Sequence, residues 1–382
     1  MDSHYGEQTM NEIYRNRHAE FAFDLLRGCV ALCADQETVC VSPYSATVAL
    51  AMAYNGARNQ TKEQIAKALH ISDVSTEEFN RQIVATELSI SETGDDDTQY
   101  LSANSLWVDK DFQIYSTYEE LCRNIFNAEA VSLFFKDPAT LEAINKWVAE
   151  KTQDKISELL KALDPLDVVV LINALYFKGN WACQFDEPYT KEKDFFCGDG
   201  SIKQVPTMVW SDPQSIPYYR NELFESVLLS YSDSSLSMLL LKPSAEHTLF
   251  ELLSQLQADK WSSWITQYQK TDCHVSMPRF ELDANIDLVP VLQNLGVIDA
   301  FECEADFFAI SNKPLHISQV VQKTYLKVDE KGSEAAAATA VVLASESVSP
   351  PALNFVLDRP FLSLLYDQNS GAILLMAAVN SL

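Results

Sequence analysis

Hydrophobic residues are spaced for helices in some blocks of the chain and for strands in others. Residues 10–29 carry apolar side chains three and four positions apart, which predicts an amphipathic helix. Residues 43–55 are almost wholly apolar and predict a buried helix. Asp137-Pro138 predicts the start of a third helix, because Asp caps helix N-termini and Pro suits the first helical position.

Other segments have the patterns of strands. Residues 168–175 form a continuous apolar run, which is typical of a central strand covered on both faces. Residues 320–328 alternate between polar and apolar. Residues 361–366 and 372–379 predict two strands joined by a hairpin turn. Separate helical and strand blocks with hairpins predict the α+β class.

The segment 328–349 has an unusual composition of small residues. Read with a period of two from Ser333, one face carries no charge and nothing larger than Leu, and the other ends in Glu334 and Glu346. No Pro interrupts the segment before Pro350. This is the pattern of a strand that could be added to a sheet with its small side buried. A run of four Ala is also typical of plain helix, and the composition also suits a linker.

The sequences on both sides favour the strand. Residues 329–337, Asp-Glu-Lys-Gly-Ser-Glu-Ala-Ala-Ala, resemble the hinge of a serpin reactive-centre loop, and residues 358–362, Asp-Arg-Pro-Phe-Leu, resemble the segment that follows it. Other matching segments are 42–45, 104–107, 144–156, 173–181 and 277–280, in the family's order. The resemblance covers nearly the whole chain. It implies one domain over residues 1–382, with three β-sheets, eight to nine helices and an exposed loop at about 332–352.

The resemblance also implies a function. A serine or cysteine protease would cleave the loop as a substrate and be trapped as an acyl-enzyme when the loop inserts into the large sheet. The alternative is a non-inhibitory serpin that acts as a carrier, chaperone or storage protein. Catalysis by the chain itself is not expected, because its six His lack paired ligand spacing and no nucleophile or phosphate-binding motif occurs. We expect no metal and no cofactor.

Individual roles follow from the matched positions. The hinge is expected at Glu330, Gly332, Ser333, Glu334, Ala335, Ala336, Ala337, Ala338 and Thr339. The residues of the shutter and breach regions, where the large sheet opens for the loop, are expected to be Ser42, Ser45, Asn173, Trp181, Arg279 and Gln322, with Thr152 nearby. Arg279 is the expected ion-pair partner of Glu330. Gln322 stands where the family commonly has His. Lys323 and Lys327 take the opposite face of this strand, so Gln322 is expected to point inward, where an amide can bridge both ways.

The attacked bond is set by its distance from the hinge. Fourteen residues beyond Gly332 lies Glu346, followed by Ser347, which suits a Glu-specific protease. A shift of one or two residues would place the cut at Ala344 or Ser345 and suit an elastase-like enzyme.

The net charge and the cysteine content limit which binding partners and which cellular compartment are expected. The net charge of −26 argues against nucleic acid and anionic membranes, and the mixed charges of residues 62–90 argue against heparin. We expect a monomer. Eight Cys without metal spacing predict free thiols. The first residues lack signal-peptide features, so the protein is expected to be cytoplasmic, or extracellular if a signal was removed.

Overall fold

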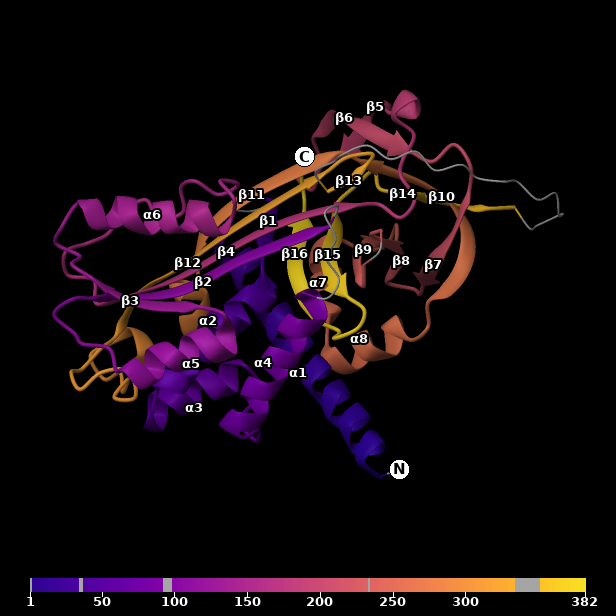
Figure 1. The fold of residues 1–382 in the computed structure, drawn as a ribbon. Helices are drawn as coiled ribbons and strands as arrows, with labels where there is room; N and C mark the ends of the chain where they lie inside the picture. Colours follow the sequence, from indigo (N-terminus) through magenta and orange to yellow (C-terminus); the bar gives the residue numbers. More distant parts are fainter. Residues whose placement is uncertain (1, 34–36, 92–97, 233, 334–350) are drawn as a thin grey trace.

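Nine α-helices and two sheets make up the part of the chain described by the computed structural model, which covers residues 2–33, 37–91, 98–232, 234–333 and 351–382, with side chains from Glu12 onward. The expected α+β class is confirmed (Figure 1). The helices are α1 (Asp2–Leu32), α2 (Pro43–Gly56), α3 (Asn59–Ala68), α4 (Thr76–Ser91), α5 (Ser116–Phe126), α6 (Ala139–Lys151), α7 (Leu249–Gln255), α8 (Ala258–Ile265) and α9 (Val289–Asn294), with 3-10 turns η1 (Glu187–Tyr189) and η2 (Asp299–Phe301).

The six-stranded sheet is built around one long buried strand. Its order is β11 (Phe280–Asp287), β12 (Ile317–Val328), β4 (Val169–Asn180), β2 (Gln99–Asp109) and β3 (Glu129–Leu133), and β13 (Gly332–Ser333) pairs with the end of β4. In Figure 1, α6 lies over one face of this sheet and α2 and its neighbouring helices lie under the other. Both faces of β4 are therefore covered, as its apolar run predicted.

The ten-stranded sheet joins the other two expected sheets into one ladder. Strand β10 pairs with β7 through residues 269–273 and with β6 through residues 276–278, so it belongs to both halves. The strands are β1 (Val39–Val41), β16 (Ile373–Val379), β15 (Phe361–Asp367), β9 (Leu236–Pro243), β8 (Phe224–Ser230), β7 (Gln214–Arg220), β10 (Gln269–Pro278), β6 (Ile202–Val209) and β5 (Lys191–Phe196), with β14 (Leu353–Val356) on β10.

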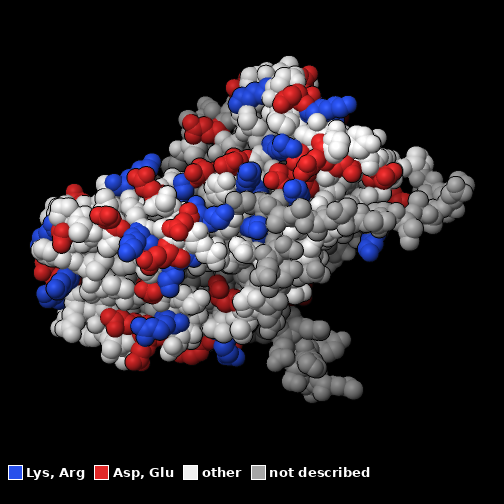
Figure 2. Space-filling model, turned by 45° about the horizontal axis from the view of Figure 1, so that its top comes forward, with Lys and Arg blue, Asp and Glu red and all other residues white. Residues whose placement is uncertain are grey.

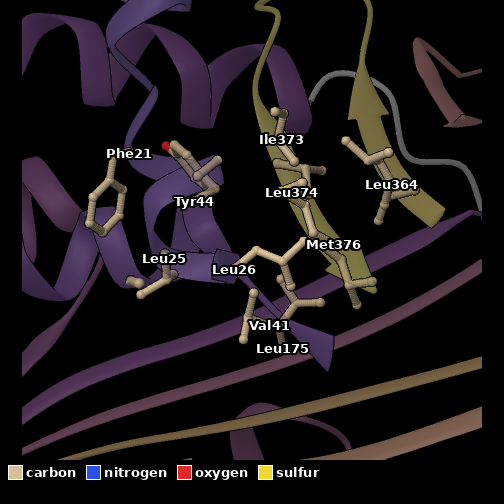
Figure 3. Packing of buried hydrophobic residues seen from close by; sticks show 14 of the residues in the cluster. Phe21, Leu25, Leu26, Val41, Tyr44, Leu175, Leu364, Ile373, Leu374 and Met376 are labelled. Carbon is tan, nitrogen blue, oxygen red and sulfur yellow. The ribbon is translucent and has the colours of Figure 1, made fainter. Parts of the chain in front are cut away.

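The main core lies between the two sheets and the first two helices. Figure 3 shows Phe21 and Leu25 of α1, Tyr44 of α2 and Leu374 of β16 converging there. A smaller cluster under α6 contains Ile144 together with residues from the opposite face of β4. Helix α2 is buried along nearly its whole length, as its apolar composition predicted.

Several boundaries differ from the sequence patterns. Helix α1 extends beyond the predicted 10–29 at both ends, and β4 continues past residue 175 to Asn180. Helix α6 begins at Ala139, one residue later than expected, although Pro138 already has helical dihedral angles and Asp137 accepts the Ala139 N–H at 3.0 Å.

The cysteines agree with the free thiols predicted from the sequence. All eight Cys lie in the described ranges and are free thiols. Within those ranges, no group of three or more His, Cys, Asp or Glu is arranged to hold a metal ion. No helix there is long and apolar enough to cross a membrane.

Candidate functional site

The hinge expected from the sequence lies where β4 and β12 end. These strands are parallel neighbours, paired from Val169 and Ile317 up to Phe177 and Leu326. Beyond β12 the chain turns at residues 329–331 and returns as β13, antiparallel to β4 (Figure 1). The β13 pairs, Gly332 with Asn180 and Ser333 with Gly179, continue the β4 ladder just above its last β12 pair.

Gly332 fits this turn because it has no side chain. A Cβ at this position would lie 1.9 Å from the carbonyl oxygen of Gly179 and 2.7 Å from Cα of Asn180. Neither neighbour is a flexible side chain that could move aside. Only glycine therefore lets the returning chain approach β4 this closely.

Ser333 is completely buried and points into the molecule. Its hydroxyl is 2.9 Å from the hydroxyl of Tyr231, which is itself buried. Burial raises the pKa of Tyr231 well above its ordinary value, and the Ser333 hydrogen bond only partly opposes this. The Tyr231 ring stacks on Trp181 at a centroid distance of 4.6 Å, and Trp181 Nε1 donates to the Asp329 carbonyl at 2.9 Å. Trp181 therefore binds the start of the turn at Asp329, and Tyr231 binds its end at Ser333.

Glu330 forms the ion pair expected from the sequence. Arg279 Nε donates to both carboxylate oxygens, at 2.7 and 2.8 Å, and the Thr190 hydroxyl also donates to Glu330. Burial alone would raise the pKa of Glu330, but the bonds from Arg279 and Thr190 outweigh it and leave the pKa below its usual value. The Glu330 side chain is only 4% exposed, whereas Arg279 is 44% exposed, so the pair is not a simple surface ion pair.

A hydrogen-bond network connects α2 to the middle of the large sheet. The Gln322 amide accepts the Ser42 N–H at 2.7 Å and donates to the Ser42 carbonyl at 2.9 Å and to Asn173 Oδ1 at 2.8 Å. Asn173 in turn donates to Asn104, to which Ser45 also donates at 3.4 Å. The inward orientation predicted for Gln322 is confirmed, and the amide bridges both ways.

Some expected positions have other roles, and some important ones were missed. Ser42 also caps α2, and Thr152 is buried at the end of α6, where it bonds the Val148 carbonyl and the Ile156 N–H, not the network. Asn104 and Tyr231 were not predicted as site residues. A polar residue within the buried half of a strand could have indicated Asn104, but Tyr231 follows β8 without any local signal.

The rest of the predicted loop lies outside the described residues. This applies to Glu334, Ala335, Ala336, Ala337, Ala338 and Thr339 of the hinge, and to Ala344, Ser345, Glu346 and Ser347 around the expected cut.

Comparison with known proteins agrees with this geometry. A family model described as serpin (serine protease inhibitor) matches residues 16–382. The chain belongs to the serpin family. Serpin B6 of Pongo abelii is 34% identical over 97% of this chain and 100% of its own length. Human Serpin B9 is 32% identical over 97% of this chain and 100% of its own length.

The solved structures most useful for comparison are also serpins. A thermophilic serpin, tengpin, in its native state superposes with a TM-score of 0.88 at 28% identity, covering 97% of this chain and 94% of that one. Human thyroxine-binding globulin gives a TM-score of 0.87 at 24% identity, covering 97% and 99%. The second likeness shows the fold alone. The comparisons do not support the extracellular location that was one expectation.

Proposed function

We propose that this serpin is a suicide-substrate inhibitor that traps a serine or cysteine protease by inserting its cleaved loop between β4 and β12. The observation that carries the proposal is the buried Ser333 of β13. It supports an assignment of the loop residues that would face the core, because side chains alternate along a strand. The two faces of the loop segment that the sequence predicts are both read from Ser333, whose side chain is buried in the structure.

Extending the β13 register predicts a complete strand. Residue 335 would pair with Phe177, 337 with Leu175, 339 with Asn173 and 343 with Val169, the first residue of β4. The core-facing positions of this strand are Ala, Ala, Thr, Val and Leu, and the α6-facing positions between them are Ala and Val. Glu334 would lie level with the partly exposed Lys178 of β4, and no other charge falls in the strand before Glu346. No charge would therefore be buried, which matters because an unpaired buried charge is very costly.

The same register explains how cleavage would disable the protease. Residue 346 would lie level with residue 166, beyond the far end of β4, and the fourteen residues from 333 to 346 span about 45 Å as a strand. The protease nucleophile would attack the Glu346 carbonyl, the bond to Ser347 would break, and the new amino group of Ser347 would leave with a proton. The resulting ester, or thioester with a cysteine protease, would then be carried along the sheet, and distortion of the protease active site would stop its hydrolysis.

The proposed partner follows from the loop and from the charge of the surface. Glu346 favours a protease with a basic primary pocket, and Ala344 or Ser345 would suit an elastase-like enzyme. On the face drawn in Figure 2, Lys and Arg are interspersed with Asp and Glu. In the region 62–90, Arg81 forms an ion pair with Glu78, and Lys62 donates a hydrogen bond to the hydroxyl of Thr76. These mixed charges support action without heparin, and we further propose a monomer that acts as one domain and needs no nucleic acid, membrane or cofactor.

The experiment is incubation with a panel of Glu-specific and elastase-like proteases, followed by denaturing gels. A band at the summed mass that survives SDS is expected, together with a released fragment that begins at Ser347. Thr339→Arg, which places a charge opposite Asn173, should convert the protein into a substrate, as should Ala335→Glu. The matched control is Ser349→Arg, which lies after the cut and should keep the stable complex.

Cleavage of the wild-type chain without a stable band would contradict the proposal. It would favour the non-inhibitory alternative, a carrier, chaperone or storage serpin.

A further inference from the structure

A pocket is lined in part by Trp181, one of the two stacked aromatic residues, Trp181 and Tyr231, that contact the hinge. Its volume is about 390 Å³, within the range of small-molecule sites. It is lined by Trp181 and Trp210, by Ile216 and Leu228 of neighbouring strands, and by Lys270. It lies outside the insertion path along β4 and outside the Gln322 network.

The walls of this pocket are suited to a flat apolar body. Ile216 is half-buried, and Leu228 is 7% exposed. Trp210 is buried and stacks on Phe185 at a centroid distance of 4.9 Å with nearly parallel rings. Because the stack on Phe185 holds Trp210 in place, a ligand would not have to order this wall of the pocket on binding.

One polar group at the pocket, the ammonium of Lys270, would prefer an anionic ligand. Lys270 lines the pocket and is exposed, and no ion pair to it is seen among the described residues. Asp186 and Asp212 accept hydrogen bonds from the N–H and the hydroxyl of Ser211.

We propose that this pocket binds a small planar aromatic carboxylate and that its occupancy is coupled to the hinge. The ring would pack against Trp181, Ile216 and Leu228, and the carboxylate would bind Lys270. The link to the hinge is a chain of direct contacts: Trp181 stacks on Tyr231, whose hydroxyl bonds Ser333. A ligand shifts a conformational equilibrium by the difference between its affinities for the two states. This proposal does not depend on protease inhibition.

The binding experiment uses 2-naphthoate and the full-length protein in a calorimetric titration. Binding is expected, with an affinity about tenfold weaker in Lys270→Gln, the size of one charge-assisted hydrogen bond. The neutral isostere 2-naphthamide should be weakened similarly on the wild-type protein. The control variant Lys67→Gln removes an equally exposed charge far from the pocket and should bind like wild type. Ile216→Trp should abolish binding by filling the space.

Three results would overturn the site: no binding of 2-naphthoate to the wild-type protein at millimolar concentration, equal binding of acid and amide, or unchanged affinity in Lys270→Gln. The coupling is tested separately with Ser333→Glu, which should displace β13 from Tyr231 by burying a charge. A change of several-fold in the 2-naphthoate dissociation constant is expected. An unchanged constant, with β13 shown to be displaced by hydrogen exchange, would refute the coupling.

Discussion

Replacing Gln322 with Ala removes three hydrogen bonds from the buried network beneath the large sheet. Two groups would lose their partner: the Ser42 N–H, now 2.7 Å from the amide oxygen, and Asn173 Oδ1, now 2.8 Å from the amide nitrogen. The Ser42 carbonyl keeps its bond from the Ala46 N–H. Gln322 is 1% exposed, so water does not reach these groups in the intact protein.

The magnitude follows from the two orphaned groups. Each buried unsatisfied polar group costs about 1–3 kcal/mol, so the loss should be about 2–6 kcal/mol. With about 2.1 cal/mol/K of unfolding entropy per residue, this corresponds to a decrease in Tm of about 3–7 °C for a chain of this length. The assay is scanning calorimetry of the intact protein at one fixed scan rate, because the midpoint of an irreversible unfolding transition depends on the scan rate.

The neighbouring residue Lys323 provides the control. Its side chain faces the opposite way and pairs with the half-exposed Asp283. Lys323→Ala should cost no more than about 1 kcal/mol, the usual value of such pairs. If Gln322→Ala melts within 1 °C of the Lys323 variant, the network does not stabilise the native state and its assignment is wrong.

Three further outcomes follow from the described residues. Burial lowers the pKa of His18 to about 4, below its value of about 6.5 in the unfolded chain. The contribution of His18 to the free energy of unfolding is therefore fully present above pH 6.5, and about 3 kcal/mol of it is lost as the pH falls from 6.5 to 4. His18→Gln should flatten that part of the stability profile, and an unchanged profile would refute the role. Gly332→Ala should speed amide exchange in residues 329–333 because of the contact with Gly179, whereas Gly198→Ala, where the nearest atom to a Cβ is the side-chain Asn380 Oδ1 at 3.1 Å, should not. Equal exchange in both variants would argue against the close approach. Cleavage at 346–347 should raise the Tm, since the inserted strand adds ladder bonds, and a lower Tm would point to a loop that does not insert.

Much of the fold was predictable because periodicity alone specified it. The apolar run at 168–175 and the buried helix at 43–55 have patterns that admit few alternatives, and both are found at those positions. Their ends were less certain. Helix α1 and strand β4 continue through residues whose local pattern is weak, because packing against neighbouring elements overrides propensity there.

The site was predictable where family position or strand parity placed a residue. The pairing of Arg279 with Glu330 and the inward Gln322 followed from family position and strand parity. The contact between Tyr231 and Ser333 joins residues 102 positions apart, and no local pattern encodes it. The joining of two expected sheets through β10 is likewise a property of strand pairing in space.

The most direct test of insertion is a crystal structure of the protein after cleavage at 346–347. The account predicts a new strand between β4 and β12, antiparallel to both, with Thr339 opposite Asn173 and Leu343 opposite Val169. A cleaved structure in which β4 and β12 remain paired from Val169 to Phe177 would contradict it.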